Sequence, residues 1–150
     1  MVMTKESGLI KQLFQEKGEM ALLDLKYIPN LSSKFVLDLM EEMGLPSPVS
    51  IMENTWLPRY EDISIGHGWG NGYVKLVEGH PWYDRDYDNI PVSVHYGLTF
   101  GRMIGENSKY FESGFWIGFD TSHHGDNLIK WPQVAVLEET IRLFEQCYLS

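Results

Sequence analysis

Cysteine is nearly absent from this chain, because Cys147 is the single cysteine among 150 residues. One cysteine excludes an internal disulfide and a zinc site built from cysteine ligands. Cys147 falls in an amphipathic helical pattern near the C-terminus, which indicates a packed thiol. We therefore do not expect it to act as a nucleophile.

Long apolar runs and basic residues are also scarce. No apolar run approaches the ~20 residues that cross a bilayer, and the first residues lack a basic start followed by an apolar core. We therefore expect a cytoplasmic protein with no membrane partner. Lysine and arginine number 12 against 21 aspartates and glutamates, for a net charge of −9. Such a charge argues against duplex nucleic acid as a partner, whereas local N–H groups, His or Arg can still hold a small anion.

Familiar catalytic spacings are missing as well. The glycine run GHGWGNG at 66–72 lacks the GK[ST] ending of a phosphate loop and precedes a strand pattern. We expect these glycines to relieve crowding in a hairpin. No HExxH pair is present, so no established metal spacing identifies a centre.

The composition that is present predicts one folded domain over 1–150, with 43% hydrophobic and 13% aromatic residues. Residues 1–45 are expected to form a helical part with helices at 5–17 and 34–43, and the apolar residues of 19–28 fit a helix or a buried strand, of which we favour the helix. Residues 46–62 are expected to be an irregular connection. Residues 63–150 carry strands at 73–77, 93–100 and 115–119, separated by a long loop at 78–92 and a mobile loop at 101–113. A closing helix should bury Val134, Leu137, Ile141 and Phe144. The order favours an α+β fold with N-terminal helices, a central, mainly antiparallel sheet with long loops, and a C-terminal amphipathic helix.

The two short helices at 19–28 and 34–43 also fit a helix-turn-helix. The second of them carries Asp38, Glu41 and Glu42, where a DNA-reading helix would need basic or amide side chains. We therefore do not expect DNA recognition.

The densest group of reactive side chains follows the apolar run at 115–119. Asp120, His123 and Asp126 occur within seven residues, with Gly125 allowing a tight turn among them. A solvated turn is the plain alternative. On the expected strand 93–100, His95 and Thr99 share a small polar face that would suit a pocket wall, although His95 could equally be a hydrogen-bonded core histidine.

Two long motifs resemble a known family. GYVKLVEGHPWYDRDYDNIPVSVHYGLTF followed by GFWIGFDTSHHGD resembles an uncharacterised family of small proteins from bacteria, phages and prophages, over roughly residues 72–148. The family implies no established reaction. The resemblance nominates these positions: Gly79, His80, Pro81, His95, Gly97, Thr99, Gly118, Asp120, His123, Gly125 and Asp126. Tyr96 stands where the family usually has glycine, and Thr121 replaces its usual cysteine, which argues against thiol chemistry there.

Three functions fit these residues. Two imidazoles and two carboxylates could hold a divalent metal ion, with His95, Asp120, His123 and Asp126 as its ligands, and activate a water for phosphoester or amide cleavage. Without metal, Asp120, His123 and His95 are candidates for acid-base catalysis on a nucleotide or phosphoester. The third is a binding module, in which aromatic side chains stack on a base while polar groups hold ribose or phosphate.

We expect binding over hydrolysis, because stacking and hydrogen-bonding groups are plentiful and no catalytic spacing is recognised. The expected ligand is small, polar and nucleotide-like, and the protein would sequester such a signal as a phage-type, anti-defence protein in the host cytoplasm. Self-association is left open. The expected ligand-binding residues are His80, Trp82, His95, Tyr96, Thr99, Asp120, His123 and Asp126.

Overall fold

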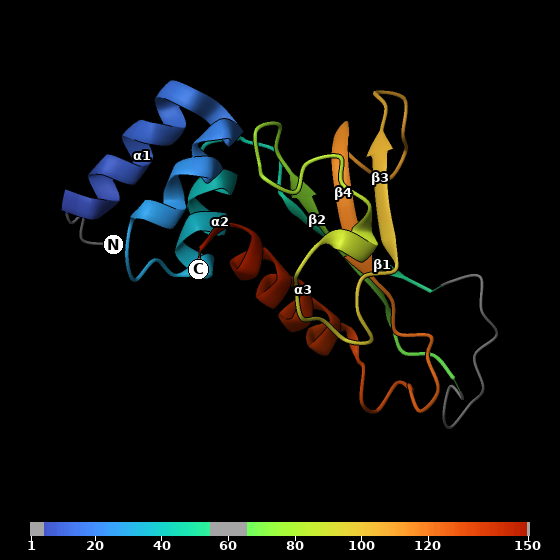
Figure 1. Cartoon of the computed structure of the whole chain (residues 1–150). Coiled ribbons are helices and arrows are strands. Elements are labelled where there is room, and N and C mark those ends of the chain that lie inside the picture. The colour runs from blue at the N-terminus through green and yellow to red at the C-terminus, as the bar shows by residue number, and fades with distance from the viewer. Residues whose placement is uncertain (1–4, 55–65, 150) are drawn as a thin grey trace.

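The computed structural model describes residues 5–54 and 66–149 and places a group of helices beside one antiparallel sheet (Figure 1). The helices are α1 (Lys5–Lys17), α2 (Ser33–Glu42), α3 (Gln133–Tyr148) and the 3-10 helices η1 (Gly18–Tyr27) and η2 (Tyr87–Asn89). The strands are β1 (Val49–Glu53), β2 (Gly70–Leu76), β3 (Phe100–Ile104) and β4 (Gly114–Phe119). The expected α+β class, with its N-terminal helices and C-terminal helix, is confirmed.

The sheet has the order β1-β2-β4-β3, and every neighbouring pair is antiparallel. β4 lies in the middle, as its run of buried aromatic and β-branched residues predicts. β1 was not expected, because residues 46–62 were interpreted as irregular; residues 55–62 lie outside the described part. The expected hairpin ahead of β2 falls partly on residues outside that part too.

One face of the sheet packs against α3, which runs between the sheet and the N-terminal helices (Figure 1). Alternate residues of β2 and β4, such as Val74 and Ile117, are fully buried beneath it. The approach is close, since a Cβ added at Gly72 would collide with Thr140 of α3 and with the Phe119 ring. The position and direction of α3 are therefore fixed against the end of β4, where the reactive residues follow.

The buried stripe of α3 differs from the expected one. Phe144 is buried as predicted, but Val134 is 59% exposed and Leu137 is also exposed. Val136 and Leu143 face the core instead. The helix lies in a groove between the sheet and η1, so the face that it buries is set by two neighbours and not by its apolar periodicity alone.

The opposite face of the sheet is covered by aromatic rings. Tyr73 contacts Phe100 and Phe111 edge to face, at 5.2 and 5.0 Å between ring centroids. Trp116 lies beneath Phe111 and donates its indole N–H to the carbonyl of Glu112. The expectation of a mobile loop over 101–113 is wrong in its first part, which is β3, and its second part folds onto the sheet through Phe111.

The helical part begins with α1 and η1, and η1 confirms a helix at 19–28 in the tighter 3-10 form. α2 matches the predicted 34–43 helix closely, and the Ser32 side chain caps it by accepting from the N–H of Phe35. The buried ammonium of Lys75 on β2 pairs with Glu19, at 3.0 Å, and so ties η1 to the sheet. No helix within 5–54 and 66–149 has the length and apolar character that a membrane crossing requires.

Candidate functional site

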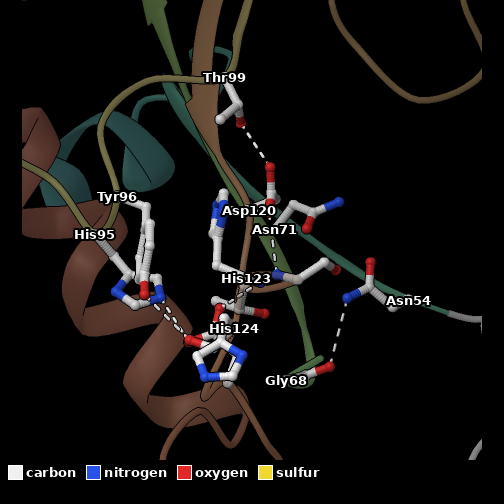
Figure 2. A network of polar contacts seen from close by, with 12 residues as sticks. Asn54, Gly68, Asn71, His95, Tyr96, Thr99, Asp120, His123 and His124 are labelled. Carbon is white, nitrogen blue, oxygen red and sulfur yellow. Dashed lines mark hydrogen bonds and ion pairs between the residues drawn. The ribbon is translucent and has the colours of Figure 1, made fainter. Parts of the chain in front are cut away.

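The expected strand at 93–100 is instead a turn, and the turn carries His95 and Tyr96 (Figure 2). Tyr96 has a φ of 57° and Gly97 a φ of 79°, both in the left-handed region, and an extended strand cannot pass through such a pair. The regular strand begins only at Phe100. The alternating faces predicted for this segment are therefore wrong, although the turn still delivers His95 toward the segment 120–126.

Asp126 holds the two distant segments together. Its carboxylate is 3% exposed, and Oδ1 accepts a hydrogen bond from Nε2 of His95 at 2.7 Å. Oδ2 accepts from the backbone N–H of His123 at 2.9 Å. The N–H of Asp126 donates in turn to the carbonyl of His123, which closes a tight turn with Gly125 at a φ of 89°. The tight turn expected at Gly125 is present.

This bond determines the tautomer of His95. Nε2 must carry the proton that it donates to Asp126, so in the neutral ring Nδ1 is an acceptor. Within the described residues no partner is recorded for Nδ1. The backbone N–H of His95 donates to Oε2 of Glu139 on α3, at 2.8 Å, and Trp131 packs beside the ring at 4.3 Å between centroids. The imidazole is thus held by Asp126 and Trp131, its backbone is held by Glu139, and Nδ1 has no hydrogen-bond partner among the described residues.

Glu139 is itself strongly held. Burial acts to raise the pKa of its carboxyl, but hydrogen bonds from Arg142 and from the N–H of His95 outweigh burial and lower the pKa overall. Glu139 is therefore an anion that positions the backbone of the turn.

A second carboxylate–imidazole pair lies beside the first. Oδ2 of Asp120 accepts from the hydroxyl of Thr99 at 2.8 Å, and Oδ1 accepts from the N–H of Ser122 at 3.0 Å. Nε2 of His123 lies 2.9 Å from Oδ1 of Asp120, yet its direction does not satisfy a hydrogen bond and the atom is buried without another partner. The pair is therefore a close carboxylate–imidazole contact without a hydrogen bond. Nε2 of His123 is thus a buried polar atom of the site without a hydrogen bond.

Tyr96 forms the outer surface of the cluster. Its ring is stacked on the His123 ring at 4.3 Å between centroids and 3° between planes, and its hydroxyl donates to the carbonyl of His124. The residue is nevertheless 61% exposed. The ring of Tyr96 is thus held flat against His123, while its backbone has a left-handed conformation that a large side chain disfavours. Such local strain is a common sign of a functional constraint.

Sequence reasoning missed four neighbours of this cluster: Asn71, Tyr73, Trp131 and Glu139. Asn71 and His123 flank Asp120 in Figure 2, and Oδ1 of Asn71 is another buried atom without a partner. The alternation in GHGWGNG could have placed Asn71 beside the site, because Asn71 lies where β2 begins and its antiparallel neighbour β4 ends. Nothing in the sequence pattern marks Trp131 or Glu139.

Two expected ligand-binding residues lie elsewhere. His80 contacts the C-terminal end of α3 at Cys147 and Tyr148, and Trp82 packs beside His80, whereas His95 contacts α3 at Glu139. Eight residues of helix separate these positions, which is about 12 Å along the axis. The predicted site is therefore divided, with six of its eight residues gathered in one cluster and two at another place.

The metal hypothesis finds little support in this geometry. Across residues 5–54 and 66–149, no group of three or more His, Cys, Asp or Glu side chains is arranged to hold a metal ion. Each expected ligand imidazole is turned toward one carboxylate, so the four side chains form two pairs and do not converge on one point. Thr121, which follows Asp120 in the chain, is fully buried and donates to the carbonyl of Gly70.

A comparison of the chain with models of known protein families finds no match, and none is found among curated proteins or solved structures.

Proposed function

We propose that the cluster of His95, Tyr96, Thr99, Asp120, His123 and Asp126 binds a small, polar, nucleotide-like ligand. The observation that carries the proposal is the exposed Tyr96 ring, which lies flat against His123. One ring face is already covered by the imidazole, so a base that stacks on the other face would extend an existing stack. Stacking of a base on an aromatic side chain contributes roughly 1–3 kcal/mol.

The polar groups beside Tyr96 supply the remaining contacts. Nδ1 of His95 accepts a hydrogen bond, and Asp120 with its partner Thr99 offers oxygens for a ribose hydroxyl. Nε2 of His123 is buried against Asp120, so this imidazole serves to support the Tyr96 ring that stacks on it.

The charge of the site restricts the ligand. Asp120 and Asp126 lie within the cluster, and the chain carries a net charge of −9. A polyphosphate would meet repulsion from both the site and the whole protein. We therefore expect nucleosides or cyclic mononucleotides to bind better than triphosphates, and duplex nucleic acid not to bind.

We propose that the protein sequesters such a molecule in the cytoplasm of a bacterial host, as a phage-type protein would. Hydrolysis is the second candidate. It is favoured by the Asp126–His95 pair, in which a buried carboxylate orients an imidazole that keeps a free acceptor nitrogen, as a general base requires.

Incubation with a panel of nucleosides and of cyclic, mono- and triphosphate nucleotides tests both candidates. After incubation, the protein is denatured and the small molecules are separated by chromatography, while a parallel titration measures affinity. Binding predicts recovery of the unchanged ligand. New products that disappear in His95→Gln would favour hydrolysis, and their loss with chelator would restore the metal hypothesis.

Tyr96 offers a matched pair of variants. Tyr96→Phe keeps the stacking ring, and it should retain affinity within about threefold. Tyr96→Gly removes the ring and also relieves the left-handed backbone, so it should weaken binding about tenfold or more without loss of thermal stability. Equal affinity in wild type and Tyr96→Gly would refute the proposed stacking site.

A further inference from the structure

A separate cavity lies at the C-terminal end of α3, where the chain brings η1, the loop at 79–82 and the last turn of α3 together. Its volume is about 170 Å³, and its lining includes Leu22, Lys26, Trp82 and Cys147. We name it the His80 cavity, because His80 forms its inner wall. Nothing in the proposed nucleotide site uses these residues, although the sequence drew attention to His80 and Trp82.

The walls of the His80 cavity are preformed. Nε2 of His80 donates to the carbonyl of Cys147 at 2.8 Å, and Nδ1 accepts from the N–H of Trp82 at 3.0 Å. Both ring nitrogens are therefore occupied in the neutral form. Burial lowers the pKa of His80, the bond to Cys147 works in the opposite direction, and the charge of Lys26 lowers the pKa further. The ring also packs against Tyr148, at 5.3 Å between centroids.

The chemistry of the lining indicates the kind of ligand. Leucine, proline, tryptophan and tyrosine side chains provide an apolar wall, and Lys26 is the one charged side chain among the lining residues. Cavities of roughly 150 Å³ accept a single benzene ring. Lys26 lines the cavity together with His80. Within the described residues Lys26 has no carboxylate partner, and its ammonium lies 5.1 Å above the exposed ring of Tyr27.

The helix end does not oppose an anion strongly. The last carbonyls of α3 carry partial negative charge, but the carbonyl of Cys147 is already covered by the N–H of His80. We propose that the His80 cavity binds a small monoanion with a flat apolar body, an aromatic carboxylate, whose ring lies against Trp82 and whose carboxylate pairs with Lys26.

Benzoate, benzamide and benzylamine test the inference, since the three share a ring and differ in charge. At ten times its dissociation constant, benzoate should raise the melting temperature of the full chain by about 3–5 °C, and the indole N–H resonance of Trp82 should shift in a titration. Trp82→Phe assigns that resonance. Benzamide and benzylamine should bind at least tenfold more weakly than benzoate.

Two lysine variants separate a specific pairing from a general effect of charge. Lys26→Gln should weaken benzoate about tenfold and leave benzamide unchanged, whereas Lys11→Gln, at an exposed lysine on α1, should bind benzoate like wild type. Equal loss in both variants, or benzamide binding as well as benzoate, would overturn the inference. A benzoate titration that leaves the Trp82 resonance unmoved would do the same.

Binding at the two sites can be abolished separately. Tyr96→Gly should lose nucleotide-like ligands and keep benzoate, and Lys26→Gln should show the reverse. Loss of benzoate binding in Tyr96→Gly would contradict an independent cavity.

Discussion

Replacement of Asp126 is the most informative perturbation of the site. In Asp126→Ala, Nε2 of His95 loses a bond of 2.7 Å to a carboxylate, and the N–H of His123 loses one of 2.9 Å. A hydrogen bond to a charged group contributes about 1.5–3 kcal/mol, and a second bond adds about 1 kcal/mol. Because Asp126 is buried, solvent replaces these bonds poorly. We expect the free energy of unfolding to fall by roughly 2–4 kcal/mol.

Urea denaturation measures this loss as a shift of the urea concentration at which half of the protein is unfolded, provided that the dependence of the unfolding free energy on urea concentration is unchanged. Asp88→Ala is the matched control, because Asp88 is exposed on η2, and surface changes of this kind stay within about 0.5 kcal/mol. Asp126→Asn keeps the shape and one acceptor, so it should lose about half as much as Asp126→Ala. A loss in Asp126→Ala no larger than in the control would refute the argument that Asp126 joins the two segments.

A double-mutant cycle then tests the pair directly. If His95 and Asp126 interact as described, the losses in His95→Ala and Asp126→Ala should be less than additive, with a coupling of about 1–3 kcal/mol. Additive losses would show that the two side chains stabilise the fold independently of each other.

Three further outcomes follow from the fold. The buried hydroxyl of Tyr148 donates to the carbonyl of Lys75 on β2 at 2.6 Å and accepts from the N–H of Val77, just after β2, at 2.9 Å, so Tyr148→Phe should cost about 2–3 kcal/mol in urea unfolding. Gly72→Ala should destabilise more than a surface glycine change such as Gly105→Ala, because its Cβ collides with Thr140. Because the pKa of His80 is lower in the folded protein, the unfolded chain binds a proton at this residue first as the pH falls. The contribution of His80 to the free energy of unfolding is therefore complete above about pH 6.5 and declines below it. The fall in unfolding free energy between pH 7.5 and 5.5 should therefore be smaller in His80→Gln.

The parts of the fold that could be predicted from the sequence are those in which local pattern and tertiary packing agree. β4 has a run of aromatic and β-branched residues that suits a central strand, and α2 has both a serine cap and an apolar repeat. The sequence also predicts that His95 lies close to the segment 120–126. The bond from His95 to Asp126 links residues that lie 31 positions apart.

The errors have physical causes. Residues 93–100 alternate as a strand does, but the bonds of His95 to Asp126 and Glu139 draw the chain into a turn, and no local propensity reports bonds that distant. The turn needs a left-handed residue at Tyr96, and only the glycine that follows it, Gly97, is of a type that indicates such a conformation. Prolines at 46 and 48 obscured β1, which is a short edge strand.

A ligand titration observed through the ring carbons and protons of the histidines tests the central claim most directly. Addition of a cyclic mononucleotide or nucleoside should shift the imidazole signals of His95 and His123 together, leave those of His80 in place, and produce no shifts in Tyr96→Gly at the same concentration. Signals of His95 and His123 that stay unmoved while another part of the protein responds would contradict the assignment of the site to this cluster.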